Sequence, residues 1–213
     1  MSGDSSISLV VGLGNPGARY RDTWHNLGFM VLDWWSAQKN LAFKPGRGDY
    51  HRLTYNSPAS KVIFLKPTPF MNLSGVPVAR VAHYLKLSPE NVLIVCDDVA
   101  LPFGTLRIRK SGSDGGHNGL ASVIAELGSE DIPRLRIGIW TEGWRGELSD
   151  YVLTAIPKSF HQDLRKMIAV AAEAIDCILT RGLGRAMNCY NRDFFQAETA
   201  KKTADSSSDD RQS

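Results

Sequence analysis

Three features are scarce in this sequence: cysteines, long apolar runs and targeting signals. The 213 residues include only three cysteines, Cys96, Cys177 and Cys189, an odd number without C-x-x-C spacing. That pattern favours reduced thiols over a disulfide framework or a zinc site. No apolar run approaches the ~20 residues that cross a bilayer. The N-terminal MSGDSSIS has neither the basic-then-apolar order of a secretion signal nor the arginines of a transit peptide. We therefore expect a soluble, cytoplasmic protein without membrane contact.

A dominant charge is also lacking. The formal net charge is +3, with 22% charged residues, which is close to the average for globular proteins. Composition alone therefore does not argue for a nucleic-acid partner. A G-x-S-x-G nucleophile elbow is absent too. What the chain does have is 43% apolar residues, enough at this length for one sizeable core.

Strand and helix patterns alternate along the chain and predict an α/β fold. Apolar or alternating runs predict strands over 7–13, 50–55, 61–66, 91–98, 104–109 and 134–140. Helical spacing predicts helices over 26–39, 118–127, 159–181 and 184–195, and another that is capped by Ser74 and reaches Leu85. The polar segment 141–149 is a candidate mobile loop. We expect one three-layer domain over 1–196, with a mixed, mostly parallel twisted sheet flanked by helices. Residues 197–213 contain no large apolar residue and are expected to be a disordered tail.

The stretch LVVGLGNPG at residues 9–17 matches the G-x-G-x-x-G spacing of dinucleotide-binding loops. A Rossmann unit also needs a helix that opens inside the motif, then a second strand ending in an acidic residue. Here the segment ARYRDTWHN follows without an apolar helical face, and Asp33 falls within a predicted helix. The dinucleotide interpretation is therefore disfavoured. The glycines are explained by a sharp turn at a strand end, which presents Asn15.

Polar side chains gather just beyond predicted strands or at helix starts. They are Asn15, His25 with Asn26, Asn72, Asp97 with Asp98, and His117 with Asn118. Asparagine donates and accepts hydrogen bonds without ionising, so this set suits a neutral carbonyl group and a water molecule. It suits a metal poorly, because hard cations prefer several carboxylates and zinc prefers His or Cys. Each residue taken alone is equally explained as a turn former or a structural hydrogen-bonding group.

In combination, these motifs resemble the bacterial-type peptidyl-tRNA hydrolases. The matching stretches are VVGLGNPGARYRDTWHNLGF, KPTPFMNLSG, LIVCDDVALPFG, GGHNGL, RLRIGI and DYVL, in order along residues 10–153, and RGLGRAMNCYN continues the likeness. The resemblance implies a monomeric α/β enzyme without metal or organic cofactor. Such an enzyme hydrolyses the ester between a stalled peptide and the 3′ end of its tRNA, which recycles tRNA from prematurely released chains.

The resemblance also assigns roles to individual residues. His25 matches the catalytic histidine and Asp97 the aspartate that supports it. The substrate-binding positions are Asn15, Tyr20, Phe70, Asn72 and Asn118, with Met71 and His117 in supporting places. The chemistry agrees, since an unperturbed imidazole has a pKa of ~6.5 and is largely free to take a proton near neutral pH. An aspartate on one ring nitrogen fixes the tautomer. We expect water itself to attack, with no covalent intermediate.

A basic patch is expected to hold the acceptor stem and 3′ end of the tRNA. Arg107, Arg109 and Arg136 match basic positions that the family is thought to use around the tRNA 5′-phosphate. Lys110 and Arg134 lie beside them in sequence. Alternation places 107 and 109 on one strand face, and likewise 134 and 136. The alternative is an uncommitted, solvated strand face.

Three residues depart from the family pattern. Trp24 stands where an arginine is usual, Ala100 replaces a common carboxylate, and Asp114 brings a negative charge into a loop that is usually neutral. These departures leave open a second interpretation, a non-catalytic RNA-binding member of the same fold, as plant organelle splicing factors are. The complete set of polar residues favours the enzyme.

Overall fold

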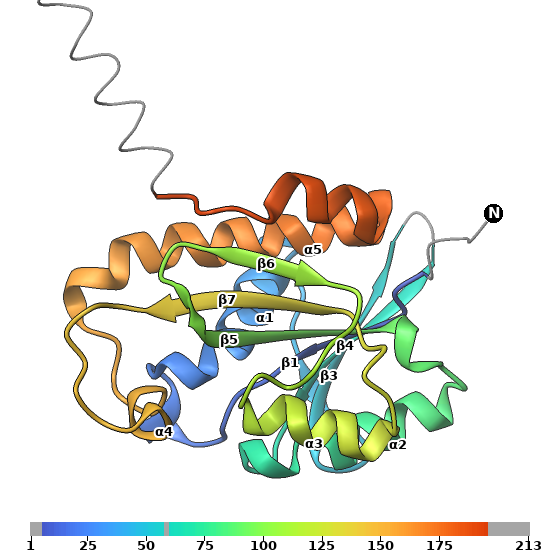
Figure 1. Cartoon of the computed structure of the whole chain (residues 1–213). Coiled ribbons are helices and arrows are strands. Elements are labelled where there is room, and N and C mark those ends of the chain that lie inside the picture. Colours follow the sequence, from blue (N-terminus) through green and yellow to red (C-terminus); the bar gives the residue numbers. More distant parts are fainter. Residues whose placement is uncertain (1–5, 58–59, 196–213) are drawn as a thin grey trace, which may run out of the picture.

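A mixed sheet lies between two helical layers in the computed structural model, which describes residues 6–57 and 60–195 (Figure 1). The strand order is β2-β3-β4-β1-β5-β7-β6. The strands are β1 Leu9–Gly12, β2 Lys44–Pro45, β3 Tyr50–Asn56, β4 Lys61–Pro67, β5 Val92–Pro102, β6 Leu106–Arg109 and β7 Arg134–Trp140. The predicted tail, 197–213, lies outside the described residues.

The sheet is parallel at its centre and antiparallel at its edges. Strand β1 pairs in parallel with β4 and with β5, and β5 pairs in parallel with β7. Strands β3 and β6 run the other way at the two sides, and β2 returns antiparallel to β3. Four central strands therefore share one direction, so their carboxyl ends meet at one edge of the molecule. This arrangement confirms the predicted mixed, mostly parallel sheet.

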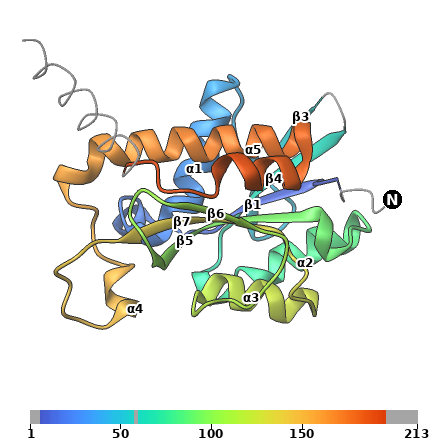
Figure 2. The same ribbon diagram turned by 45° about the horizontal axis from the view of Figure 1, so that its top comes forward.

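Helices cover both faces of the sheet, as expected for three layers (Figures 1 and 2). Helix α1 (Leu27–Gln38) and the long α5 (His161–Tyr190) lie on one face, and α2 (Gly75–Tyr84) and α3 (Asn118–Leu127) lie on the other. Each face has its own apolar cluster against the strands. None of the helices within the described ranges is both long and apolar enough to cross a bilayer.

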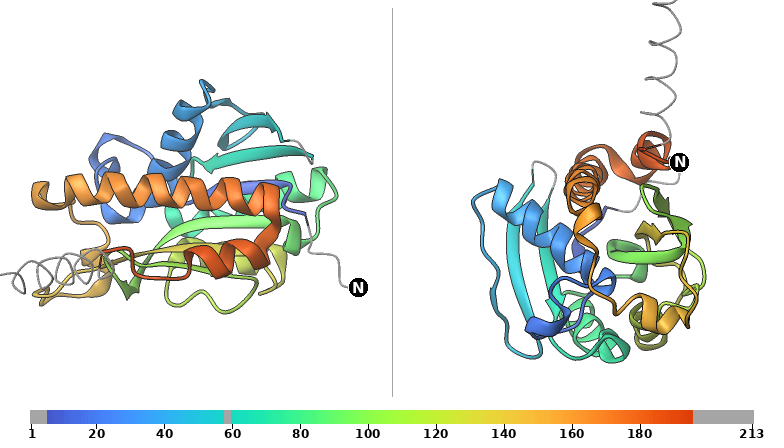
Figure 3. Two further views of the ribbon diagram at one scale, coloured as in Figure 1. Left: turned by 90° about the horizontal axis from the view of Figure 1, so that it is seen from above. Right: turned by 90° about the vertical axis from the view of Figure 1, so that its left-hand side faces the viewer.

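Helix α5 contains a sharp break between the two helices predicted there, although the second ends at Tyr190 and not at residue 195. Gly182 has φ 80° and ψ 165°, values outside the helical region. The helix breaks at this glycine, and the short segment 183–190 runs back beside the long first part (Figure 3). Only a residue without a Cβ adopts this conformation readily.

Three local predictions need correction. Strand β5 continues to Pro102 instead of ending at Asp98, because β7 pairs with it across a register shift between Asp98 and Pro102. Ser74 precedes α2 but makes no capping bond, and its hydroxyl lies 4.0 Å from the sulfur of Met71. The predicted loop 141–149 runs into a short helix, α4 (Leu148–Tyr151).

Two glycines of the 9–17 stretch, Gly12 and Gly14, allow close packing between β1 and α1, whereas Gly17 has φ 98° and no atom of the described residues within 4 Å of an added Cβ. A Cβ on Gly12 would overlap the carbonyl of Gly28, and one on Gly14 would lie 2.6 Å from the ring of Phe29. Asp33 lies within α1 and pairs with Lys66, so it is not placed at the end of a second strand as a ribose-binding acid would be. The glycine spacing therefore has a structural cause.

Candidate active site

A cavity of about 630 Å³ opens at the carboxyl ends of the central strands. Of the residues singled out from the sequence, those that line it are Asn15, Tyr20, His25, Phe70, Met71, Asn72, Asp97, Asp98, His117, Asn118 and Arg136. Arg107 and Arg109 are not among its lining residues. The topology therefore brings together polar residues that are as much as 121 positions apart in this set, from Asn15 to Arg136.

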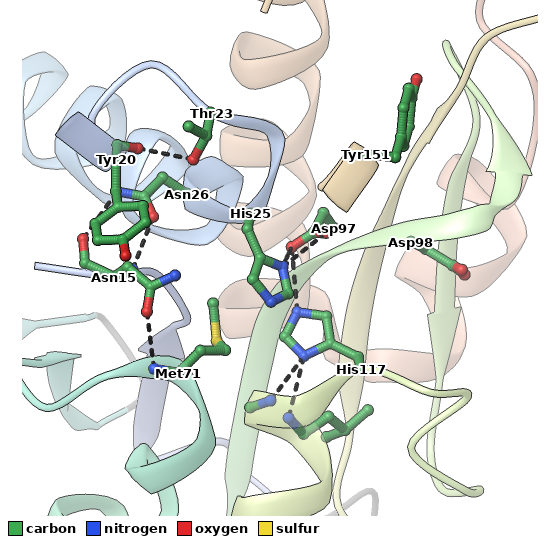
Figure 4. Close-up of polar contacts among 12 residues, drawn as sticks. Asn15, Tyr20, Thr23, His25, Asn26, Met71, Asp97, Asp98, His117 and Tyr151 are labelled. Atoms are coloured by element: carbon green, nitrogen blue, oxygen red, sulfur yellow. Dashed lines mark hydrogen bonds and ion pairs between the residues drawn. The ribbon is translucent and has the colours of Figure 1, made fainter. Parts of the chain in front are cut away.

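An aspartate between two histidines forms the centre of the cavity (Figure 4). His25 lies in a 3-10 turn, Trp24–Asn26, just before α1, and Asp97 lies on β5. The Nδ1 atom of His25 is 3.1 Å from each carboxylate oxygen of Asp97. His117 approaches from the other side, with Nε2 3.1 Å from Oδ1. His25 and Asp97 are only 5% and 2% exposed, so water screens this pair little.

The start of α3 fixes the tautomer of His117. Its Nδ1 accepts hydrogen bonds from the backbone N–H groups of Gly119 and Leu120, at 3.1 and 3.2 Å, as the N-cap of the helix. A nitrogen that accepts carries no proton, so the proton of the neutral ring is on Nε2 and is donated to Asp97. Nε2 therefore has no lone pair for a metal, although His25, Asp97 and His117 lie close enough together to resemble a ligand set.

Asp97 in turn fixes the tautomer of His25. Burial by itself raises the pKa of the Asp97 carboxyl, but the neighbouring His25 and His117 rings outweigh it and hold that pKa well below its usual range. An ionised carboxylate only accepts, so Nδ1 of His25 carries the proton and donates it. The other ring nitrogen, Nε2, is left with its lone pair and makes no hydrogen bond within the described residues. It is a proton acceptor in the wall of the cavity.

Asn15 is held so that its amide nitrogen remains available. Its Oδ1 accepts from the backbone N–H of Met71 at 2.8 Å, which fixes the orientation of the amide. Its backbone N–H donates to Oδ1 of Asn26 at 2.7 Å, and Nδ2 of Asn26 returns a bond to the Asn15 carbonyl at 3.1 Å. The sequence analysis grouped Asn26 with the polar residues but did not predict these two hydrogen bonds. They form between residues that are 11 positions apart, so no local sequence pattern indicates them.

Asn72 and Asn118 are exposed, and their side-chain amides form no hydrogen bond with any described residue. Asn72 belongs to the 3-10 turn Met71–Leu73 and Asn118 is the first residue of α3. Both line the same cavity as His25. Together with Asn15 they supply uncharged donors and acceptors around one basic nitrogen.

Apolar side chains form two rims of the cavity. On one side Tyr20 and Phe70 pack edge to face, with ring centroids 6.4 Å apart. On the other, α4 contributes Leu148 and the following turn Leu153, 49% and 43% exposed. The α4 rim was missed from the sequence because its segment is short, polar and glycine-containing. A backbone bond from the His25 N–H to the Val152 carbonyl, 2.8 Å, ties this rim to the histidine.

The four arginines of β6 and β7 have different surroundings. They form two cross-strand pairs, Arg107 with Arg136 and Arg109 with Arg134. Arg134 is 1% exposed and binds backbone carbonyls only, whereas Arg136 forms an ion pair with Asp98 at 2.8 Å. Arg107 is half-buried and its Nε makes no hydrogen bond in the described part of the chain, and Arg109 is exposed.

Two of the three departures from the expected pattern, Trp24 and Asp114, have side chains with structural roles. Trp24 is buried against Phe103, Tyr151 and Phe160, so it packs in the core. The carboxylate of Asp114 accepts from the Gly116 N–H at 2.7 Å and shapes the turn before His117.

At the third position, Ala100 donates its N–H to Oδ1 of Asp98 at 2.9 Å. Asp98 points away from Asp97 (Figure 4). None of the three departures displaces a cavity-lining polar residue.

Comparison with known proteins agrees with this geometry. The sequence profile of the peptidyl-tRNA hydrolase family matches residues 9–201. The chain is 45% identical to the peptidyl-tRNA hydrolase of Symbiobacterium thermophilum over 187 residues, covering 86% of this chain and 98% of that protein. It is 40% identical to that of Chlorobaculum tepidum over 185 residues, covering 87% and 98%. The crystal structure of peptidyl-tRNA hydrolase from Acinetobacter baumannii superposes with a TM-score of 0.83 at 30% identity, covering 91% of this chain and 99% of that one.

Proposed function

Because this chain belongs to the peptidyl-tRNA hydrolase family, we propose that it cuts the ester between a peptide and the 3′ end of its tRNA, using water activated by His25. One observation carries this mechanism. The buried carboxylate of Asp97 accepts a hydrogen bond from the Nδ1–H of His25 and leaves Nε2 as a base in a cavity lined by three asparagines. A base so placed removes a proton from water, and such catalysis typically contributes 10²–10⁴-fold to a rate.

The reaction needs no group beyond these side chains and one water molecule. Nε2 of His25 takes a proton from water as the water oxygen bonds to the ester carbon. Negative charge then develops on the former carbonyl oxygen, where asparagine N–H donors stabilise it. One such donor is worth roughly 10²–10³ in kcat in other hydrolases. When the bond to the ribose oxygen breaks, the His25 imidazolium returns the proton to that oxygen. The products are a tRNA with a free hydroxyl and a peptide carboxylic acid, which releases its remaining proton to the solvent and becomes a carboxylate.

Asp97 stabilises the imidazolium, and His117 positions Asp97. The carboxylate accepts from both rings at 3.1 Å, so it cannot rotate away without losing a bond to the N-terminal end of α3 through His117. The amide nitrogen of Asn15 is a donor whose direction is set by Met71. Tyr20 and Phe70 provide an aromatic surface for the substrate beside it.

The tRNA is expected to extend from the cavity across β6 and β7. Arg136 lies both in the cavity lining and opposite Arg107, so the two guanidinium groups continue the cavity along the sheet edge, with Arg109 beyond. Arginine suits phosphate because its planar fork donates two parallel hydrogen bonds. We expect the acceptor stem to bind here, to a monomer working in the cytoplasm, with residues 1–196 as the catalytic unit.

The experiment is direct hydrolysis of N-acetyl-phenylalanyl-tRNA by the purified chain, followed by release of N-acetyl-phenylalanine. We expect multiple turnovers without added metal or cofactor, and loss of turnover in a His25→Ala variant that retains its circular dichroism spectrum. A wild-type chain that binds the tRNA but leaves the ester intact would contradict the proposal and favour a non-catalytic RNA-binding protein.

A further inference from the structure

A second cavity, of about 360 Å³, lies between α2 and β3 and shares no lining residue with the first. Three arginines line it: Arg47 in the loop between β2 and β3, Arg52 on β3, and Arg80 on α2. They come from separate elements, and the fold brings them to one hollow. This volume is in the range of small-molecule sites, which are typically ~300–1,000 Å³.

The hollow is positive and its charge is not neutralised from within. No carboxylate is among its lining residues, and within residues 6–57 and 60–195 none of Arg47, Arg52 and Arg80 forms an ion pair. Arg80 reaches across to the β2–β3 loop, since a Cβ on Gly48 would lie 2.7 Å from its Nη1. Guanidinium groups gathered in this way repel one another, so an anion bound among them is stabilised. Their planar forks match phosphate oxygens.

An apolar and aromatic surface continues from the arginines. Ile63 and Val81 are 9% and 7% exposed and form the floor. Tyr84, the last residue of α2, is 84% exposed, the highest among the large apolar side chains described. Tyr50 packs partly against the core on the opposite side. An exposed aromatic ring beside an apolar floor is a stacking surface for a planar base.

We propose that this second cavity binds a nucleotide, with its phosphate on Arg47, Arg52 and Arg80 and its base stacked on Tyr84. Phosphate alone would leave the tyrosines and the aliphatic floor uncovered. An acidic peptide would satisfy the arginines but has no flat group for Tyr84. The nucleotide is either free or one unit of an RNA strand, since both present the same phosphate and base. The proposal does not rest on hydrolysis, because the two cavities are separate.

The test is isothermal titration of the full chain with adenosine 5′-monophosphate, inorganic phosphate, adenosine and hexa-adenylate RNA, at low salt. We expect the monophosphate to bind more tightly than either phosphate or adenosine alone. Arg80→Ala and Arg47→Ala are each expected to weaken it about tenfold, which corresponds to the ~1.4 kcal/mol of one charge-assisted contact. Tyr84→Ala is expected to weaken the monophosphate and leave inorganic phosphate unchanged.

The matched control is Arg165→Ala, because Arg165 is exposed on α5, on the other face of the sheet. It should bind like the wild type. Tighter binding of the hexamer with a steeper salt dependence identifies RNA as the source, and equal affinity identifies a free nucleotide. The proposal is wrong if the monophosphate binds no better than adenosine, or if Arg80→Ala and Tyr84→Ala bind it as well as Arg165→Ala does.

Discussion

Replacing Arg134 by methionine is expected to destabilise the protein and to disturb the site without touching a catalytic group. The guanidinium is buried and donates to four backbone carbonyls: Ile132 at 2.7 Å, Gly112 at 2.6 Å, Ser113 at 3.0 Å and Glu130 at 3.3 Å. Burial lowers the pKa of this guanidinium. Two of the residues it holds, Gly112 and Ser113, begin the loop that leads to His117 and Asn118, whereas Glu130 and Ile132 lie between α3 and β7.

The magnitude follows from these contacts. Hydrogen bonds to a charged group contribute roughly 1.5–3 kcal/mol each, offset by the desolvation of the charge. Methionine keeps the apolar stem of Arg134 and leaves the four carbonyls without their donor. We expect the free energy of unfolding to fall by about 3–5 kcal/mol, a large part of the ~5–15 kcal/mol of a typical domain. A shift of about 1 Å in the His117 loop is expected to lower kcat about 100-fold.

The assays are urea unfolding followed by circular dichroism, and ester hydrolysis under conditions where the variant is folded. Arg134→Lys is expected to be intermediate, since an ammonium has three donors and no fork. Arg165→Met, on the exposed surface of α5, should stay within about 0.5 kcal/mol of the wild type. A loss below about 1 kcal/mol for Arg134→Met, with unchanged kcat, would refute the reasoning.

Three further predictions concern the cavity and the basic patch. His117→Ala removes the helix cap and should lower both the free energy of unfolding, by about 1 kcal/mol, and kcat. His117→Asn restores a capping side chain, so it should recover the stability but not kcat. Recovery of both would contradict the proposal that His117 positions Asp97. Because the imidazoles hold the pKa of Asp97 below its unfolded value, its stabilising contribution is complete above about pH 4 and is lost as the pH falls further. In urea titrations, lowering the pH from 5 to 3 should therefore reduce the free energy of unfolding of the wild type more than that of Asp97→Asn. Equal dependence of the two free energies on pH would contradict a stabilising role for ionised Asp97. Arg109→Ala should raise KM, leave kcat unchanged and reduce the salt slope of tRNA binding by about 1, and an unchanged slope would remove Arg109 from the interface.

The helices and strands were predictable because the spacing of apolar residues in the sequence matches the spacing of buried side chains in the structure. Helix α3 and strand β7 have the predicted bounds, 118–127 and 134–140. In β7 the apolar residues Leu135, Ile137 and Ile139 are fully or almost fully buried. Strand β5 was cut short since Asp97 and Asp98 interrupt its apolar run, although the backbone continues to pair with β7. A hydrophobic pattern predicts only buried apolar residues, so it ended this strand too early, at the buried carboxylates of Asp97 and Asp98.

The polar side chains that line the cavity were predictable, but its α4 rim and the hydrogen bonds of the polar side chains were not. The identity of Asn15, His25, Asp97 and His117 was plain from motif and chemistry. That Nδ1 of His117 caps α3 depends on how the loop before it folds, which adjacent residues do not encode. Arg134 and Arg136 show the same limit. They alternate identically in sequence, yet one supports a loop and the other pairs with Asp98, since only tertiary structure decides what stands opposite each.

The most direct test of the account is chemical rescue of His25→Ala in the hydrolysis of N-acetyl-phenylalanyl-tRNA. The variant removes only the base from the wall of an open cavity, so its kcat should fall by ~10²–10⁴-fold. Added imidazole should then restore part of that rate, more so as the pH rises and free imidazole loses its proton, and should leave the wild-type rate unchanged. A His25→Ala variant that cleaves the ester at the wild-type rate would contradict the central claim.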